Sequence, residues 1–243
     1  MTERNFEEKY PKNFLTSVAC EIRFDPLVMI QNYIPEFQEK IRGELPSYGV
    51  ESTFPVIDAS LRSQFSGANQ WVFKSRDKIK TLKIVINRIG FIVSKYDNFE
   101  DFYDEVTKYF NEFFKICKIN EFSRIGLRYV NKFKLNELED SEEISLIKFF
   151  NPVLDKVIIE GYNPFQFETA IRWENNGNTL FLKNEFSIEP SGESNYVIDI
   201  DAFKSGNLKK KDLELIIKEL YKLEVKEFHN HITDEIINIL RGD

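Results

Sequence analysis

The chain has 243 residues and a formal net charge of −7 at pH 7, and 23 of its residues are phenylalanine. Aromatic side chains bury large areas on folding, so this composition excludes a chain that is disordered over most of its length. The negative charge disfavours a protein that binds nucleic acid over its whole surface. Binding of nucleic acid in a local basic groove is compatible with this charge.

Apolar patterning bears on the compartment. No run approaches the roughly 18 apolar residues of a membrane-spanning helix, and the charged segment 1–10 is not typical of a signal peptide. Cys20 and Cys117 each lie on an apolar stripe, which predicts two reduced thiols in a protein core. We therefore expect a cytoplasmic protein that does not associate with membranes.

The first half of the chain predicts the element order β-α-β-β-β-β-α. Alternating apolar residues from Val18 to Phe24 indicate a half-buried strand. Asp25 and Pro26 stop this strand and start a helix, which Pro35 is expected to kink. Four strands are expected to follow, at 54–65, 71–75, 81–87 and 89–96.

A long helix closes this half, and Asp97 or Asn98 is expected to cap its N-terminus. Its predicted buried stripe consists of apolar residues at helical spacing, namely Phe99, Phe102, Val106, Phe110, Phe113 and Cys117.

The second half repeats the same predicted order. A strand starts at Arg124, and a short helix is expected at 144–150 after an acidic loop. The segment 175–178 has the composition of a hairpin turn, with Gly177 free to adopt positive φ. A helical pattern runs from Lys209 to the end of the chain and is expected to break near Val225. The strands expected between these helices lie at 157–160, 165–173, 179–188 and 196–201.

The recurring element order predicts a duplicated α+β fold. We expect two tandem halves, residues 14–120 and 121–243, each with an antiparallel sheet crossed by a long helix in a helix-grip-like arrangement. A single fused domain with one core is the alternative.

Two carboxylates in the second half are candidates for chemistry. Asp199 and Asp201 are two residues apart on a predicted strand, so they point to the same face. Paired carboxylates bind Mg²⁺ or divide acid and base roles, and Glu168 is a possible third member. The competing interpretation is that they pair with Arg124 or Arg128 on a neighbouring strand.

Basic residues are concentrated on predicted strands. Arg124, Arg128 and Lys132 share one strand face, and the first sheet also carries several cations, including Lys83 and Arg88. Such a face binds phosphate or single-stranded nucleic acid in some proteins. The interleaved acids favour an outer face with salt bridges instead.

Common catalytic motifs are missing from the sequence. It contains no Walker A motif, no G-x-G-x-x-G, no G-x-S-x-G and no C-x-x-C. His229 and His231 are the only histidines, and residues two apart on a helix do not face together. Two-His zinc motifs are therefore not expected, and we expect neither a metal nor a cofactor.

The central segment 124–131, R-I-G-L-R-Y-V-N, resembles the R-I-G-L-R-Y-x-N motif of a sporadically distributed bacterial and archaeal protein family of similar length. The strand 20–24, Asp199-Ile200-Asp201 and Ile232-Thr233 add to the resemblance. The family has no assigned function. Its patchy distribution is similar to that of defence and toxin–antitoxin components, and the resemblance implies such a role for this chain.

These observations lead to three hypotheses, of which the first is a non-enzymatic binding or adaptor module in a defence or toxin–antitoxin system. Its expected partner is another protein or a second copy of the chain. The second is a small-molecule or nucleotide sensor with an aromatic pocket between sheet and helix. The third is a metal-dependent nuclease or phosphotransferase. The candidate binding residues are those of the family-like positions: Arg124, Arg128, Tyr129, Asn131, Asp199 and Asp201.

Overall fold

The structure is a computed structural model that describes residues 9–52, 69–138, 146–150 and 165–242. Two compact units make up the chain. Unit 1 comprises residues 1–17, 127–203 and 218–243, and unit 2 comprises residues 18–126 and 204–217. Each unit is discontinuous in sequence, whereas the halves expected from the element order are continuous. The strands predicted at 54–65 and 157–160 lie outside the described residues.

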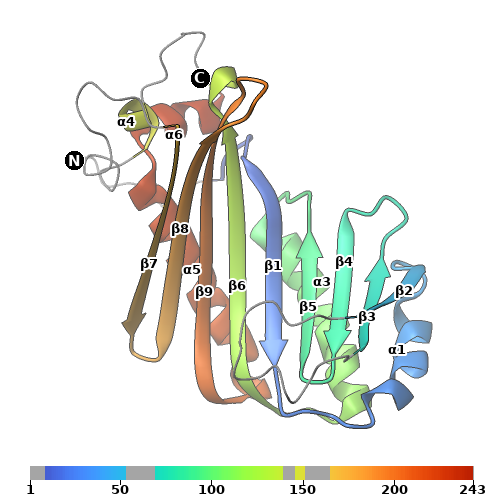
Figure 1. The fold of residues 1–243 in the computed structure, drawn as a ribbon. Coiled ribbons are helices and arrows are strands. Elements are labelled where there is room, and N and C mark those ends of the chain that lie inside the picture. The colour runs from blue at the N-terminus through green and yellow to red at the C-terminus, as the bar shows by residue number, and fades with distance from the viewer. Residues whose placement is uncertain (1–8, 53–68, 139–145, 151–164, 243) are drawn as a thin grey trace. The chain divides into compact units, whose positions relative to one another are not determined.

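The described chain is α+β, as predicted (Figure 1). Its strands are antiparallel and follow the order β2-β3-β4-β5-β1-β6-β9-β8-β7 in a single sheet, so the expectation of two separate sheets is not met. The bounds are β1 Leu15–Arg23, β2 Ser47–Ser52, β3 Asn69–Lys74, β4 Lys80–Val85, β5 Arg88–Val93, β6 Glu121–Lys134, β7 Gln166–Asn175, β8 Asn178–Ile188 and β9 Ser194–Lys209.

Helices separate groups of strands along the chain. Their bounds are α1 Ile34–Ile41, α3 Phe99–Cys117, α4 Leu146–Phe149, α5 Leu213–His231 and α6 Asp234–Arg241. Short 3-10 turns are η1 Ile30–Asn32, η2 Leu135–Glu137 and η4 Lys210–Asp212. None of the helices in the described ranges is long and apolar enough to cross a membrane.

The strand order has an internal regularity. Read outward from β1, the order is β1-β5-β4-β3-β2, and read outward from β6 it is β6-β9-β8-β7. In both runs the first strand in sequence is followed by the last, and the remaining strands come in reverse order. The first run has the element order β-α-β-β-β-β-α, although its strand β2 is not one of the predicted strands. The described part of the second run contains one strand fewer after its short helix.

Unit 2 folds around α3, whose sequence specifies both its start and its end. The side chain of Asn98 accepts a hydrogen bond from the backbone N–H of Asp101 at 2.9 Å, which confirms the predicted cap. All six residues of the predicted stripe are buried. The helix ends at Lys118, which adopts the left-handed conformation with φ 56°. In Figure 1, α1 and α3 lie on the same side of strands β2–β5.

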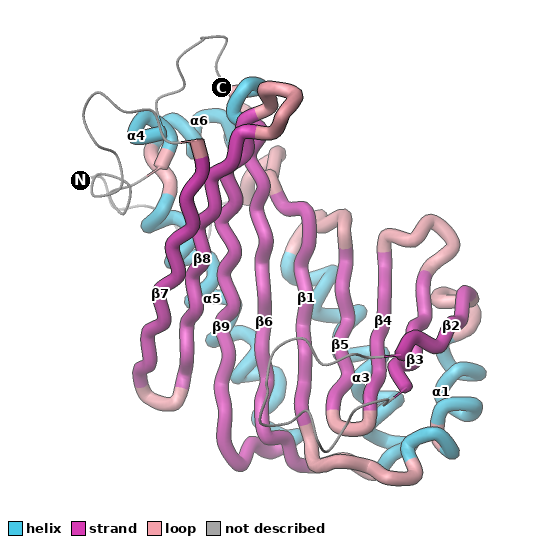
Figure 2. The backbone as a smooth tube through the Cα atoms, in the orientation of Figure 1, coloured by secondary structure: helices cyan, strands magenta, loops and turns pink. Residues whose placement is uncertain are grey.

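Unit 1 contains the β7–β8 hairpin, α6 and α5 from Lys218 onward (Figure 2). Asn176 and Gly177 both have positive φ, of 51° and 79°, as the predicted hairpin turn requires. Its core combines rings and aliphatic side chains. The members are Phe133, Leu135, Leu146, Phe149, Phe150, Leu182, Phe186, Tyr196, Ile198, Ile200, Ile232, Ile236, Ile237 and Leu240.

Three boundaries differ from the predictions. The first helix begins at Ile34 instead of following Pro26, because Pro35 sits in its first turn, where the missing N–H costs nothing. Strand β9 continues to Lys209, eight residues beyond its predicted end. The C-terminal helical segment breaks at Ile232–Thr233 instead of near Val225. There, Thr233 donates its backbone N–H to the carbonyl of Phe149.

Candidate functional site

In each unit the sheet has one face of buried apolar side chains and one face that carries charges. Strand alternation defines the second face, which we call the charged face. In unit 1 it carries Arg128, Glu168, Lys183, Glu185 and Asp199, and in unit 2 it carries Glu21, Arg23, Lys83, Arg88 and Arg124.

Arg128 and Asp199 form the most tightly defined ion pair of unit 1. The Nε and Nη2 atoms of Arg128 donate to the two carboxylate oxygens of Asp199 at 2.8 and 2.5 Å. This bidentate geometry raises the pKa of Arg128 above its usual value. Asp199 is only 12% exposed at its side chain, whereas Arg128 is 56% exposed. The structure thus agrees with the salt-bridge interpretation of Asp199, because both its oxygens are bound by the guanidinium.

Glu224 lies behind this pair, on α5, and was not among the predicted site residues. Its Oε1 accepts the backbone N–H of Ala202 at 2.9 Å. Its Oε2 is buried and has no hydrogen-bond partner in the described residues. Burial raises the pKa of Glu224 well above its usual value, and the negative charges of Asp201 and Asp199 add to the shift. The carboxyl group is therefore protonated over a wider pH range than an exposed glutamate.

The remaining predicted residues are distributed over different environments. Tyr129 and Asn131 are buried on the apolar face of β6, opposite to Arg128, and the Tyr129 ring lies 6.3 Å from that of Tyr221. Asp201 is on β9 two residues after Asp199 and is half-buried. Unit 1 brings Arg128 and Asp199 together, while Tyr129 and Asn131 have the surroundings of core residues.

Arg124 belongs to unit 2, and the local backbone explains its position. Phe122 and Ile125 are both buried although they are three residues apart, so the alternation of β6 shifts by one residue between them, as in a β-bulge. A Cβ added to Gly126 would lie 2.7 Å from Nη1 of Arg124. The glycine therefore gives the guanidinium space to lie along the strand and reach Glu21, with Nη1 3.4 Å from Oε1.

Two further charged arrangements were missed at the sequence level, because they depend on strand register. In unit 2, Arg23 and Arg88 are direct cross-strand partners on β1 and β5, and both contact Glu21. In unit 1, Glu168 and Glu185 are direct partners on β7 and β8. Lys183 contacts both carboxylates, at 3.0 and 3.2 Å.

The cysteines and histidines are engaged in the core. Burial raises the pKa of both thiols, that of Cys117 to about 12, so neither is a ready nucleophile. The Nδ1 atom of His229 donates to the carbonyl of Val225 at 2.8 Å, and its Nε2 accepts from the hydroxyl of Tyr10 at 3.0 Å. Among the described residues, no group of three or more His, Cys, Asp or Glu side chains is placed to hold a metal ion.

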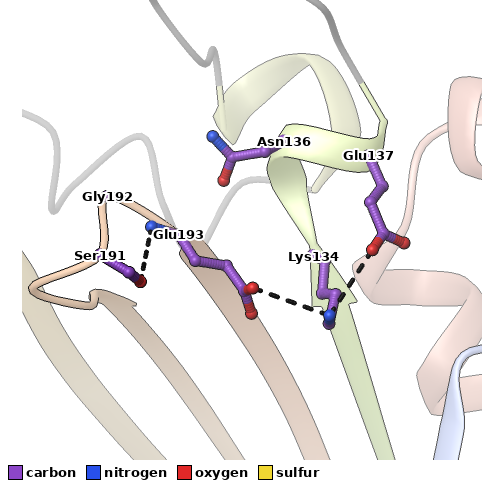
Figure 3. A pocket seen from close by; sticks show the side chains of 6 residues that line it. All are labelled: Lys134, Asn136, Glu137, Ser191, Gly192 and Glu193. Carbon is purple, nitrogen blue, oxygen red and sulfur yellow. Dashed lines mark hydrogen bonds and ion pairs between the residues drawn. The ribbon is translucent and has the colours of Figure 1, made fainter.

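A polar pocket of about 380 Å³ lies in unit 1, where β6 ends and β8 turns into β9. Figure 3 shows that its charged groups pair with one another. Lys134 lies between Glu137 and Glu193, with Nζ–O distances of 3.6 and 3.7 Å. Asn136 uses its Oδ1 to accept the backbone N–H of Ser194. The other lining residues are Ser191 and Gly192. This pocket is polar, unlike the aromatic cavity that the sensor hypothesis expects.

The aromatic residues of unit 2 pack against each other between α3 and the strands. The Phe91 ring centroid lies 5.2 Å from Tyr109 and 6.0 Å from Phe102, and that of Phe37 lies 5.2 Å from Phe113. Such distances are those of rings in contact. These rings therefore act as packing partners in the core.

Comparisons with known proteins do not add an assignment. No family model matches the sequence, and a search of curated proteins gives no match either.

Proposed function

We propose that this protein is a cytosolic, non-enzymatic adaptor that binds a basic partner protein through the charged face of unit 1. The observation that carries the proposal is the Glu168–Glu185 pair. Two carboxylates that face each other directly across neighbouring strands destabilise a sheet. Here they share one cation, Lys183, so one negative charge stays uncompensated within this trio.

The composition of unit 1 supports the same partner chemistry. This unit contains 14 Lys and Arg residues against 23 Asp and Glu residues, a net charge of −9. A surplus of this size attracts a basic protein and accelerates its association, more strongly at low ionic strength. Glu168 and Glu185 are 57% and 40% exposed at their side chains, so both are accessible to a partner.

The role in a defence or toxin–antitoxin system is part of this proposal. It is supported by the resemblance of residues 124–131 to the sporadic family described above. We also propose that the chain arose by duplication of a helix-grip-like β-α-β-β-β-β-α unit. The matching strand orders on the two sides of β1 and β6 support this history.

The test is native mass spectrometry of the protein purified gently from its own host, followed by binding measurements with the identified partner. We expect a basic polypeptide of defined mass whose binding weakens as salt is added. Glu168→Gln together with Glu185→Gln is expected to weaken binding at least tenfold. Glu174→Gln is the matched control, because Glu174 is an exposed acid on the same strand that pairs locally with Arg172.

Two outcomes would contradict the proposal. One is a protein that carries no second polypeptide under any gentle condition. The other is a partner whose binding is equally strong in the double variant. A second copy of the same chain would instead identify a homodimer. If the affinity of that homodimer did not change with salt, the charged face of unit 1 would not be its binding surface.

A further inference from the structure

The charged face of unit 2 carries a second arrangement, which the partner proposal does not use. Arg23 is the last residue of β1 and Arg88 is the first residue of β5, and the two are direct cross-strand partners. Side chains in such positions have Cβ atoms about 4.5–5.5 Å apart. Two guanidinium groups are therefore held next to each other by the register of the sheet.

Folding alone gives no benefit from this placement. Like charges directly opposite each other destabilise a strand pair. The shared carboxylate of Glu21 compensates only one of the two charges. Its Oε1 lies 2.7 Å from Nε of Arg23, but its Oε2 lies 3.8 Å from Nε of Arg88, beyond hydrogen-bond distance. Arg124 approaches the same carboxylate at 3.4 Å.

The surroundings favour access by an anion. Arg23 and Arg88 are 44% and 41% exposed at their side chains. Gly90 follows Arg88 by two residues on β5, and it is the cross-strand partner of Glu21 on one side and of Lys83 on the other. With no side chain at this position, the two arginines and the lysine border a bare segment of strand. Lys83 makes no ion pair within the part of the chain that the structure describes.

We infer that Arg23, Arg88 and Lys83 form a binding site for a phosphoryl group on unit 2. The guanidinium fork matches the oxygens of a phosphate in two parallel hydrogen bonds, and two adjacent forks provide this geometry twice. A bound phosphoryl group would supply the negative charge that Glu21 supplies only in part. Two sources of such a group are a free nucleotide and the backbone of single-stranded nucleic acid.

The experiment is isothermal titration calorimetry of the full chain in a low-salt chloride buffer. The probes are inorganic pyrophosphate, ADP and a short oligothymidylate. We expect saturable binding of at least one probe, weakened about tenfold or more by Arg23→Gln and by Arg88→Gln. Arg42→Gln is the matched control, because Arg42 is an exposed arginine of the same unit that pairs with Glu39. It is expected to bind like the wild type.

Glu21→Gln distinguishes a specific site from a loss of folding, because it changes affinity in the opposite direction. Removal of the negative charge that contacts both arginines is expected to strengthen binding of an anion about fivefold. Binding of pyrophosphate and ADP with this pattern identifies a nucleotide-type ligand. The same pattern with the oligothymidylate alone identifies the nucleic-acid backbone.

Three results would overturn the inference. They are no saturable binding of any probe, equal binding by the Arg23 and Arg88 variants, and weaker binding by the Glu21 variant when circular dichroism shows it folded. None of these results bears on the partner proposal, since that proposal is tested with residues of unit 1. Failure of the two proposals can thus be told apart.

Discussion

The two units use the same charge arrangement with opposite signs. In unit 2, two arginines face each other across β1 and β5, and a glutamate two residues before Arg23 contacts both. In unit 1, two glutamates face each other across β7 and β8, and a lysine two residues before Glu185 contacts both. Each trio keeps one uncompensated charge, positive in unit 2 and negative in unit 1.

The total charges follow the same division. Unit 2 has 19 Lys and Arg residues against 17 Asp and Glu residues, a net charge of +2, whereas unit 1 has a net charge of −9. The overall charge of −7 is therefore the sum of a strongly acidic unit and a weakly basic one. Electrostatic arguments about partners have to be made for each unit separately, because a ligand is attracted by the charges nearest to it.

The units also differ in the side chains that form their cores. Truncation of a core side chain is expected to have the largest effect on stability of the changes compared between the units. In unit 2, Phe113 is fully buried, and its ring lies near those of Phe24 and Phe37. We expect Phe113→Ala to lower the free energy of unfolding by about 4 kcal/mol. In unit 1, Ile236 is equally buried but aliphatic, and Ile236→Ala is expected to cost about 3 kcal/mol.

Urea denaturation followed by circular dichroism measures both effects. Phe113→Leu serves as the control, because it keeps most of the apolar volume and should lose much less than Phe113→Ala. If Ile236→Ala destabilised the protein more than Phe113→Ala, the aromatic core of unit 2 would not be the one that is more sensitive to truncation.

Local signals made part of this fold predictable. The cap at Asn98, the buried stripe of α3 and the turn at Asn176–Gly177 each depend on residues close in sequence, and all three are present. The length of β9 was not predictable in the same way. After Asp201 its side chains are mostly half-buried or exposed, so the apolar alternation that marks a strand fades.

The candidate site was predictable only where the alternation of side chains along a strand was enough to place a residue on a face of the sheet. Placing Asp199 and Arg128 on compatible strand faces required periodicity alone, and their pairing was anticipated. The Arg23–Arg88 pair depends on the register between β1 and β5, two strands that no turn joins directly, and periodicity does not fix this register. The sequence contains a signal for Glu224. It lies four residues from both Leu220 and Phe228, on the apolar stripe of the helix, where an acid is out of place.

Each unit contains a glutamate with a shifted pKa, and the two shifts make stability depend on pH in opposite directions. Burial and neighbouring acids raise the pKa of Glu224 in unit 1, whereas hydrogen bonds from Lys108 and Tyr109 lower the pKa of Glu44 in unit 2. Between pH 4.5 and the raised pKa of the folded state, Glu224 holds a proton in the folded state that the unfolded state has lost. Stability from Glu224 is therefore full below that pH and falls as the pH rises toward the folded pKa, by about 1.4 kcal/mol per pH unit.

Glu44 has the opposite sign, because its stabilising effect is present above pH 4.5 and disappears as the pH falls. Urea denaturation across this range, with Glu224→Gln and Glu44→Gln, tests the pair. We expect Glu224→Gln to remove the loss of stability toward neutral pH, and Glu44→Gln to remove part of the loss toward acid. Arg128, whose positive charge opposes the shift of Glu224, stays unchanged in both variants. A Glu224→Gln variant with the wild-type slope would show that this carboxyl does not titrate differently on folding.

The smallest expected effect concerns how helices end in the two units. In unit 1, α6 ends at Gly242 with φ 88°, whereas in unit 2, α3 ends at Lys118 with φ 56°. A left-handed conformation costs an L-residue roughly 1–2 kcal/mol, and glycine adopts it without that strain. Part of the gain from a glycine is offset by the greater entropy of the unfolded chain. Lys118→Gly is therefore expected to stabilise the protein by about 0.5–1 kcal/mol in urea denaturation.

Lys118→Ala separates backbone strain from the loss of the lysine side chain, because alanine keeps the Cβ and should bring little gain. Gly242→Ala is the converse change, and its new Cβ would approach nothing closer than the Lys12 side chain at 3.9 Å. Any loss there reports conformational strain, which we expect to be about 1 kcal/mol. If Lys118→Gly and Lys118→Ala had equal effects, the strain at the end of α3 would be too small to distinguish the two units, and their helix ends would be energetically equivalent.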